Sequence, residues 1–546
     1  MISSFSIPDT LAVVPVIFNA GAAVLPALLG ALASFVTLLF KPRELFAACK
    51  RRPMVLLAVL LVGMAIFLWI KSPSAAHSPA QLTAATSPRI TNSNDPDWAA
   101  VALEIIRQEA RAKALGKTEI EPTVNAGPPS DGADALQFRG DKSRTGFLGG
   151  SSPSKLVPLW EYSEIGAVFL SSVLVHQGKV YGASAFLDPG GSFGTIFCLD
   201  AATGEEIWVT ETSDLSAKTE LMGIFSSPAI TADGKNLLIG EGLHLDYGSS
   251  LICLDTASGR VKWNIKTPIH IESSPAIEGD IVVVGAGAIE KGSDHKPQGD
   301  PQGEGHPGFV LGVRISDGEE LWRHQVNDPE SSPVIHDGVA YIGSGINGNA
   351  VVAIRIAPDD KLNGEPRELW RTSTPFPTSG AVTLAEDFIL VGCGAGDFVF
   401  TAANPEGAVI ALDPKSGKIL WDAKMPDAIL GPIAVKDQVA LCPVRNGELV
   451  ALDLTAKGKE LWRARVHKNS PLLSGPAFTG GKAYAVSSDG YLAVIDAKTG
   501  SVTESIYLND PRKPGELGLS VSSPLVADGR IFVGSETGGL RCYVGK

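Results

Sequence analysis

The stretch IFCLDAATGEEIW at residues 196–208 returns in degenerate form along the chain, and each copy ends in tryptophan. The related stretches read LICLDTASGRVKW at 251–263, VLGVRISDGEELW at 310–322, AIRIAPDDKLNGEPRELW at 353–370, VIALDPKSGKILW at 409–421 and LVALDLTAKGKELW at 449–462. A repeat with a period of roughly fifty residues is typical of solenoids, propellers and similar arrays. The period therefore decides the fold class before any single residue is considered.

Each copy predicts four short strands. The first strand follows a turn of small residues, which reads SSPAI at 226 and 273, SSPVI at 331, SSPLV at 522, SSVLV at 171, SGAVT at 379, GPIAV at 431 and SGPAF at 474. An alternating strand such as GVAYIGS at 338–344 follows, and a third strand ends in Leu-Asp. Eight openings predict eight four-stranded sheets, and a radial array of sheets closed on itself is a β-propeller.

The turn before the tryptophan has the form Asp-x-x-Ser/Thr-Gly. The aspartate can accept hydrogen bonds from backbone amides inside the turn, and the glycine can adopt the positive φ that a side chain resists. The clearest copies pair Asp200, Asp255, Asp413 and Asp496 with Gly204, Gly259, Gly417 and Gly500.

The tryptophans are predicted to bridge neighbouring sheets. Burying such a ring contributes on the order of 2–3 kcal/mol per blade. The predicted blade-docking residues are Trp160, Trp208, Trp263, Trp322, Trp370, Trp421 and Trp462.

The repeat pattern G-x-[LIV]-x-A-[LI]-D-x-x-[ST]-G-x-x-x-W resembles that of the PQQ-like (quinoprotein alcohol dehydrogenase-like) propellers. The resemblance covers residues 137–546, about three quarters of the chain. It implies an all-β, eight-bladed β-propeller. It leaves the function open, because this family includes quinoprotein dehydrogenases, the assembly lipoprotein BamB of the outer-membrane β-barrel machinery, and sensor domains of membrane kinases.

The two ends of the repeat region predict how the ring closes. The last copy stops at Lys546 without a tryptophan strand, and the stretch LVPLWEY around Trp160 precedes the first full opening. We therefore expect this early strand to complete the eighth sheet. The seventh copy reads SVTESIYL after its turn and has no tryptophan, so its docking is expected to be weaker or to use Ile506 and Tyr507.

The N-terminal region predicts a helical membrane anchor within residues 1–71. Two apolar segments, about 11–40 and 54–70, approach the length that crosses a bilayer. The loop between them is basic, which predicts that it is cytoplasmic and that the propeller lies on the periplasmic or extracytoplasmic side of the bacterial inner membrane. Residues 72–136 are predicted to form a stalk helix followed by a flexible linker.

Alternatives remain for parts of this anchor. The first apolar segment could be re-entrant or interfacial, whereas a cleaved signal peptide is disfavoured because no basic residue precedes it. The stretch LFAAC ending at Cys49 is similar to a lipoprotein cleavage box, but charged residues flank it and a second apolar segment follows. Lipidation is therefore the minor alternative.

Charge excludes one class of partner. The formal net charge is −13, and the N-terminal 71 residues contain six basic against two acidic side chains, so the acidic excess lies in the rest of the chain. An acidic soluble domain argues against nucleic acid as a partner.

Cysteine and histidine give no sign of a redox or metal centre. The propeller cysteines, at 198, 253, 393, 442 and 542, are never adjacent and form no C-x-x-C motif. The resemblance implies a vicinal disulfide over the cofactor in PQQ-dependent alcohol dehydrogenases, and none is possible here. The histidines are scattered without ligand spacing, and those of the insertion at 290–308 are interpreted as loop residues. No metal site and no disulfide are predicted.

Two functions remain open. The first is a membrane-anchored scaffold or sensor that binds a protein partner on one propeller face, in the manner of BamB, with no cofactor and no catalytic residues. The alternative is a quinoprotein-like dehydrogenase with PQQ and calcium in the central funnel. An Asp, Asn, Glu and Arg cluster above an aromatic floor in that funnel would favour the alternative.

The topology can be tested with reporter fusions. An alkaline phosphatase fused after Pro122 is expected to be active, because the basic loop at residues 41–53 keeps the two flanking segments outside the cytoplasm. A reporter that works only in the cytoplasm, fused at the same point, is the control. Activity of the control and inactivity of the phosphatase would reverse the predicted topology.

Overall fold

A computed structural model describes residues 134–546, except 165, 189–190, 217–218, 245, 290–304, 399–400 and 514. The predicted anchor, its two apolar segments, Cys49 and the stalk helix lie outside the described residues. Among the residues described, no helix is both long and apolar enough to cross a membrane.

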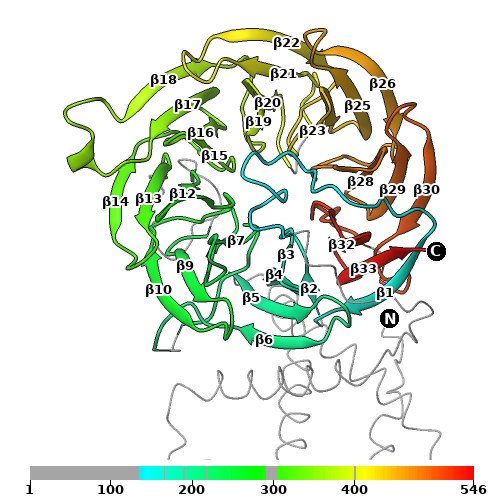
Figure 1. Cartoon of the computed structure of the whole chain (residues 1–546), viewed down its shortest axis with the longest axis horizontal. Helices are drawn as coiled ribbons and strands as arrows, with labels where there is room; N and C mark the ends of the chain where they lie inside the picture. Colours follow the sequence, from blue (N-terminus) through cyan, green and yellow to red (C-terminus); the bar gives the residue numbers. More distant parts are fainter. Residues whose placement is uncertain are drawn as a thin grey trace, which may run out of the picture. The chain divides into compact units, whose positions relative to one another are not determined.

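The described chain forms eight β-sheets arranged around a central axis, which confirms the predicted eight-bladed propeller (Figure 1). Blade 1 contains β2 (Ala167–Val168), β3 (Leu174–His176), β4 (Lys179–Asp188), β5 (Gly191–Asp200) and β6 (Glu206–Thr210). Blade 2 contains β7 (Ala229–Ile230), β8 (Asn236–Gly240), β9 (Ser250–Asp255) and β10 (Val261–Lys266). Blade 3 contains β11 (Ala276–Glu278), β12 (Ile281–Ala286), β13 (Phe309–Arg314) and β14 (Glu320–His324).

The next three blades follow the same meander. Blade 4 contains β15 (Val334–His336), β16 (Val339–Ser344), β17 (Ala350–Arg355) and β18 (Glu368–Ser373), with a 3-10 turn at Asp359–Lys361. Blade 5 contains β19 (Thr383–Ala385), β20 (Phe388–Gly394), β21 (Gly407–Leu412) and β22 (Ile419–Met425). Blade 6 contains β23 (Ala434–Lys436), β24 (Val439–Pro443), β25 (Glu448–Asp453) and β26 (Lys459–Arg465).

Blades 7 and 8 bring the two ends of the ring together. Blade 7 contains β27 (Ala477–Thr479), β28 (Lys482–Val486), β29 (Tyr491–Asp496) and β30 (Val502–Tyr507). Blade 8 contains β31 (Leu525–Ala527), β32 (Arg530–Gly534), β33 (Leu540–Gly545) and, as its outer strand, β1 (Leu156–Tyr162). Figure 1 shows β1 beside β33, the first and last strands among the described residues. The predicted closure by the strand around Trp160 is therefore confirmed.

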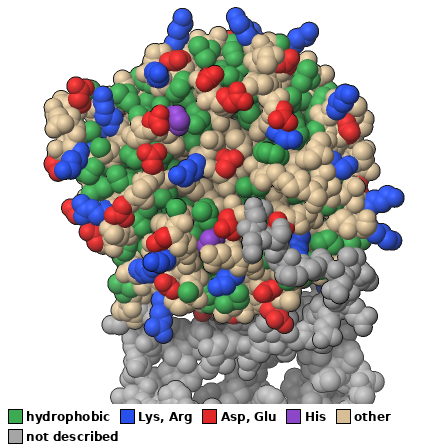
Figure 2. Space-filling view, viewed as in Figure 1, with side chains coloured by type: hydrophobic (Ala, Val, Ile, Leu, Met, Phe, Trp, Pro, Cys, Tyr) green, Lys and Arg blue, Asp and Glu red, His purple; other side chains and the backbone are tan. Residues whose placement is uncertain are grey.

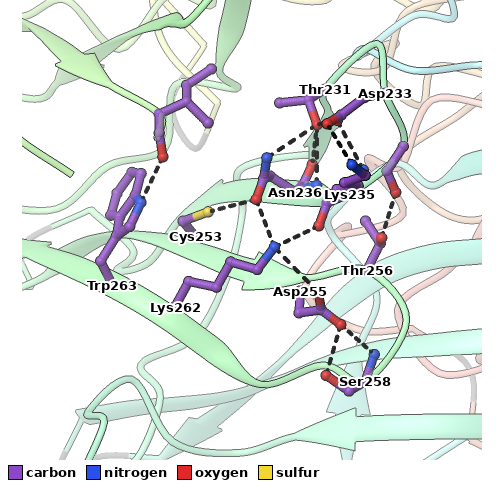
Figure 3. Close-up of polar contacts among 12 residues, drawn as sticks. Thr231, Asp233, Lys235, Asn236, Cys253, Asp255, Thr256, Ser258, Lys262 and Trp263 are labelled. Atoms are coloured by element: carbon purple, nitrogen blue, oxygen red, sulfur yellow. Dashed lines mark hydrogen bonds and ion pairs between the residues drawn. The ribbon is translucent and has the colours of Figure 1, made fainter. Parts of the chain in front are cut away.

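Each tryptophan of the repeat lies against the turn of the next blade. Six of the seven indole nitrogens donate to a backbone carbonyl there, at 2.8–3.1 Å. Trp263, for example, donates to the Ile315 carbonyl, and Asp255 caps its own turn by accepting from the Ser258 amide and hydroxyl (Figure 3). The rings of Trp160, Trp208 and Trp322 are buried, and the other four are half-buried.

The turn glycine makes this docking possible. An added Cβ at Gly259, whose φ is +69°, would lie 2.5 Å from Cε3 of Trp208. The tryptophan of the preceding blade lies equally close to the corresponding glycines of other blades, which are Gly204, Gly318, Gly417, Gly458 and Gly500. The glycine thus serves both the turn conformation and the contact with the ring.

Small residues lie opposite the tryptophans within each sheet. Cys198, Cys253 and Cys542 pair with Trp208, Trp263 and Trp160, at positions that alanine or glycine fills in blades 3 to 6. All five cysteines of the described residues are buried and free, and burial raises the pKa of the Cys198 thiol to about 12. These cysteines are small packing residues, as their place in the repeat predicts.

Blade 7 differs from the prediction. The register places Glu504 where the other blades have tryptophan, because it pairs with Val494 directly before the bulge. Both carboxylate oxygens of Glu504 accept from the Leu156 amide of the adjacent blade, at 3.1 Å. The link to blade 8 at this position is therefore a polar contact. Beside it, Ile506 packs against a buried cluster that includes Leu156 and Val526 of blade 8, as expected, whereas Tyr507 lies against Tyr491 of its own blade.

Residues 134–155, which we call the strap, cross the middle of the disc before reaching β1 (Figure 1). Their backbone makes hydrogen bonds with the inner strands of successive blades. The amides of Ile230, Leu384, Val435 and Phe478 donate to strap carbonyls, and the strap amide of Ala135 donates to Val175. The strap therefore ties together blades that lie far apart in the sequence.

Two buried arginines fasten the strap to the blades. Arg144 is fully buried, and it donates to the carbonyls of Ser274, Pro275 and Pro333 in blades 3 and 4. Arg139 donates to the carbonyl of Gly475 in blade 7. Burial lowers the pKa of Arg144 to about 9 and that of Arg139 to about 10, because the charge of Asp141 only partly offsets the loss of solvent around each guanidinium.

Two glycine substitutions separate the docking contact from the turn conformation. Gly259→Ala is expected to destabilise the propeller by about 1–2 kcal/mol through its positive φ and by on the order of 2–3 kcal/mol more through displacement of Trp208. Gly279→Ala is the matched control, because its φ is +61° but no atom lies within 4 Å of the added Cβ. Urea unfolding followed by tryptophan fluorescence measures both, and equal losses would contradict docking through this glycine.

The strap can be tested by truncation. A chain beginning at Asp134 is expected to fold, whereas a chain beginning at Leu156 loses the strap but retains β1. Each buried hydrogen bond lost costs about 0.5–1.5 kcal/mol, so the shorter chain should unfold at a clearly lower temperature. Calorimetry of both chains checks this, and equal midpoints would mean that the strap does not contribute to stability.

Candidate functional site

The inner strands enclose a small central cavity. Two rings of side chains line it, one with a residue from each blade and one with a residue from every blade except blade 7, and Phe138 of the strap and Phe398 also contribute. The cavity has a volume of about 60 Å³. Since a water molecule needs roughly 10–15 Å³ measured in this way, the cavity holds only a few waters.

The second residue of each opening turn forms a belt around the axis. The amide of Ser523 donates to the Ser172 hydroxyl, and the same contact runs from Ser172 to Ser227, from Ser227 to Ser274 and from Ser274 to Ser332, at 2.9–3.0 Å. The repeated serines therefore link neighbouring blades, and their hydroxyls are structural.

The residue before each opening turn forms the other ring. In chain order its members are Leu170, Phe225, Glu272, Glu330, Ser379, Leu430, Leu473 and Val521. Glu272 and Glu330 are its two charged members, and they come from neighbouring blades. The ring is otherwise apolar apart from one serine.

The described lining does not match a quinone site. PQQ has three carboxylates, which need cationic partners, but the charged groups that line this cavity are the carboxylates of Glu272 and Glu330. The buried guanidiniums of Arg139 and Arg144 already donate to backbone carbonyls. The dehydrogenase alternative predicts a mixed cluster of Asp, Asn, Glu and Arg in the funnel. The described residues that line the cavity do not form such a cluster.

Two histidines converge on Glu330. His244 Nδ1 lies 2.9 Å and His270 Nε2 lies 3.1 Å from the same atom, Glu330 Oε1. The three residues come from three loops, after β8, after β10 and after β14. The Glu272 carboxylate accepts from the His244 amide at 2.5 Å, and Asp328 lies buried two residues before Glu330.

The electrostatics of this group are strongly perturbed. Burial alone would raise the pKa of Glu330, but the hydrogen bonds from His244 and His270 outweigh burial and lower the pKa to about 2. Burial, together with the charge of Glu330, raises the pKa of Glu272 to about 7 and that of Asp328 to about 8. Burial disfavours the charged form of His270, yet its bond to Glu330 raises the pKa overall.

No pattern in the sequence predicted this group. His244, His270 and Glu330 form no short motif, because His270 and His244 lie 60 and 86 residues before Glu330 in the chain. One signal was available, since Glu272-Ser-Ser-Pro and Glu330-Ser-Ser-Pro occupy the same place in adjacent repeats, where other copies have an apolar residue. The histidine of the insertion that is described, His306, lies against Phe309 and not in this group.

Comparison with known proteins identifies the family. Residues 158–391 and 362–545 match the family model described as outer membrane protein assembly factor BamB. The chain belongs to this family. The predicted PQQ-like repeat is thereby confirmed.

Individual relatives are distant. The BamB protein of Yersinia pestis is 24% identical over 373 residues, which cover 64% of this chain and 80% of that protein. The quinohemoprotein alcohol dehydrogenase ADH IIB of Pseudomonas putida is 34% identical over 108 residues, which cover 18% of this chain and 15% of that enzyme. The crystal structure of the quinohemoprotein alcohol dehydrogenase from Comamonas testosteroni has a TM-score of 0.55 at 15% identity and covers 81% of this chain and 84% of its own, a likeness of fold.

Removal of the Glu330 carboxylate tests how much its contacts with the two histidines contribute to the free energy of unfolding. Glu330→Ala is expected to cost about 2–4 kcal/mol at neutral pH, because it leaves the buried His270 without an acceptor. The matched control is Glu368→Ala, which removes the acceptor of the more exposed His324 and should cost less than about 1 kcal/mol. Urea unfolding of both variants measures the two losses.

The pH dependence of this loss has a defined sign. The pKa of Glu330 is lowered from 4.5 to about 2 in the folded chain, so its contribution is complete above pH 4.5 and is lost as the pH falls towards 2. The stability difference between the chain and Glu330→Ala should therefore shrink over this range. A constant difference would contradict the assignment.

Proposed function

We propose that this chain is a membrane-tethered, extracytoplasmic protein-interaction propeller that binds a protein partner on one face. Membership of the family described as outer membrane protein assembly factor BamB supports an assembly or scaffolding role. The Yersinia pestis relative, which carries the same name, aligns over most of its own length.

The position of exposed apolar side chains carries the proposal. Outside the outer strands, the large exposed hydrophobic residues of the described chain are Leu187, Leu215, Ile346 and Leu517, with exposed fractions of 44%, 63%, 37% and 65%. Leu215 and Leu517 lie in loops that lead from an outer strand to the next inner strand. Leu187 and Ile346 lie at hairpins between a second and a third strand.

These four positions belong to the same face. In a four-stranded antiparallel meander, the connection from second to third strand and the connection to the next blade emerge on one side. The opposite side bears the Asp-x-x-Ser/Thr-Gly turns, and the exposed large hydrophobic residues nearest to it, such as Ile419 and Val502, lie at the start of outer strands. We call the side with the four residues the apolar-loop face. We infer that a protein partner buries exposed apolar side chains of this face on binding.

Charge is consistent with a protein partner. In the view of Figure 2, acidic and basic side chains are interspersed, and no broad patch of one sign covers the surface. Such a surface offers no electrostatic footprint for nucleic acid.

The tether and the location remain parts of the proposal. They rest on the apolar segments at 11–40 and 54–70 and on the basic loop between them. The dehydrogenase alternative draws on the fold shared with the Comamonas testosteroni enzyme. It is less well supported, because carboxylates supply the charge in the small central cavity.

Site-specific crosslinking tests the proposed face. A photoreactive amino acid at position 215 or 517 of the full chain, in its native membrane, should give a discrete crosslinked protein. Position 461 is the control, because Leu461 is 50% exposed but lies on outer strand β26.

The matched charge substitutions complete the test. Leu215→Glu and Leu517→Glu should reduce recovery of the crosslinked partner with the chain, whereas Leu461→Glu should not. Equal crosslinking from all three positions, or none from the loops, would reject this face.

A further inference from the structure

We propose that His244, His270 and Glu330 form a mononuclear site for a divalent transition-metal ion, and that Zn²⁺ suits this ligand set best. The three donor atoms lie within 4.8 Å of one another. They come from loops of blades 2, 3 and 4, on the apolar-loop face. This inference does not depend on the proposed function.

The spacing is close to what a metal ion requires. Tetrahedral Zn²⁺ with bonds of roughly 2.0–2.1 Å separates two ligand atoms by about 3.3 Å. The observed separations from Glu330 Oε1 are 2.9 Å to His244 Nδ1 and 3.1 Å to His270 Nε2. An ion thus requires the two carboxylate–imidazole pairs to part by only a few tenths of an ångström, and the two imidazole nitrogens already lie within 4.8 Å of each other. The His244 side chain is 43% exposed, so close packing does not prevent that adjustment.

The burial of His270 calls for a strong interaction at its Nε2 atom. The side chain is fully buried, and among the described residues its Nδ1 atom has no hydrogen-bond partner. Burying a polar ring with one of its two nitrogens unpaired costs free energy, which an apolar residue at this position would avoid. A bond from Nε2 to a metal ion offsets that cost.

Glycines keep space beside the donor atoms. A Cβ added at Gly287 would lie 2.2 Å from His270 Nε2 and 3.0 Å from Glu330 Cγ. At Gly242, a Cβ would lie 2.9 Å from His270 Cβ. The backbone therefore approaches the ligand set closely at two points where any side chain would displace it.

The chemistry of the donors selects the ion. Ca²⁺ and Mg²⁺ prefer sites made of oxygen ligands, whereas two imidazoles and one carboxylate suit Zn²⁺ and its neighbours. Three protein ligands leave a fourth coordination position, as in zinc sites that bind water or an incoming group. Because His244 is exposed, this position is accessible from the apolar-loop face.

The test uses the purified full chain in detergent, stripped of metal with a chelator. Titration with Zn²⁺ in competition with a chromophoric chelator should give one ion per chain. Titration with Co²⁺ should give the visible absorption bands of a tetrahedral or five-coordinate site. Absence of both signals would overturn the proposal.

Variants assign the site. His244→Gln and Glu330→Gln should each weaken Zn²⁺ binding by at least about 10- to 100-fold, the loss seen when even the supporting partners of zinc ligands are removed. His324→Gln is the matched control, since His324 pairs with Glu368 but has no second histidine beside it in the described structure.

The Zn²⁺ affinities of the variants decide whether these residues bind the ion. Loss of binding in the first two variants, with His324→Gln unchanged, supports the site. Because His244 is on the surface, His244→Gln should fold, which thermal unfolding without metal verifies. Equal affinity in all variants, or equal loss in the control, would place any bound ion elsewhere and overturn the proposal.

Discussion

The contact between a tryptophan ring and the turn glycine of the next blade is the interaction on which the rest of this propeller depends. The ring supplies apolar area, the indole nitrogen supplies a directed hydrogen bond, and the glycine supplies the space for both. Since this contact recurs at nearly every blade boundary, it sets the angle between sheets and therefore the number of blades. The serine belt near the axis adds polar contacts between blades 8, 1, 2, 3 and 4, so these boundaries are held at an outer and an inner radius.

Such a rigid ring can hold buried charged groups that would destabilise a less constrained fold. Two carboxylates from neighbouring blades, Glu272 and Glu330, lie at the same level of the central cavity, where other blades present apolar side chains. The loops that follow β8, β10 and β14 bring two histidines to one of them. A polar group of this kind, buried and only partly satisfied, is typical of a functional site and not of a packing core.

The sequence predicts the architecture well and the site poorly, for one physical reason. The fold depends on a pattern repeated every blade, so the strands, the turns and the closing strand at Trp160 are all visible in the printed sequence. The site depends on deviations from that pattern, which acquire meaning only when the blades are superposed. Glu504 illustrates this, because its position opposite Val494 follows from strand register and not from the type of residue. The strap has no periodicity at all, since most of its contacts are made by backbone atoms that any sequence provides.

The strap and the closing strand also constrain the order in which the molecule can form. Glu161 and Arg541 pair across 380 residues, and Gly146 accepts from Phe478 in blade 7. A chain emerging from the ribosome or crossing a membrane has made its strap and β1 long before their partners exist. The disc therefore cannot close until β33 has been released, and until then β1 is an unpaired edge. A nascent chain of this design has a long interval in which it is open to chaperones or to misassembly, and its folding is slow because its decisive contacts span the whole sequence.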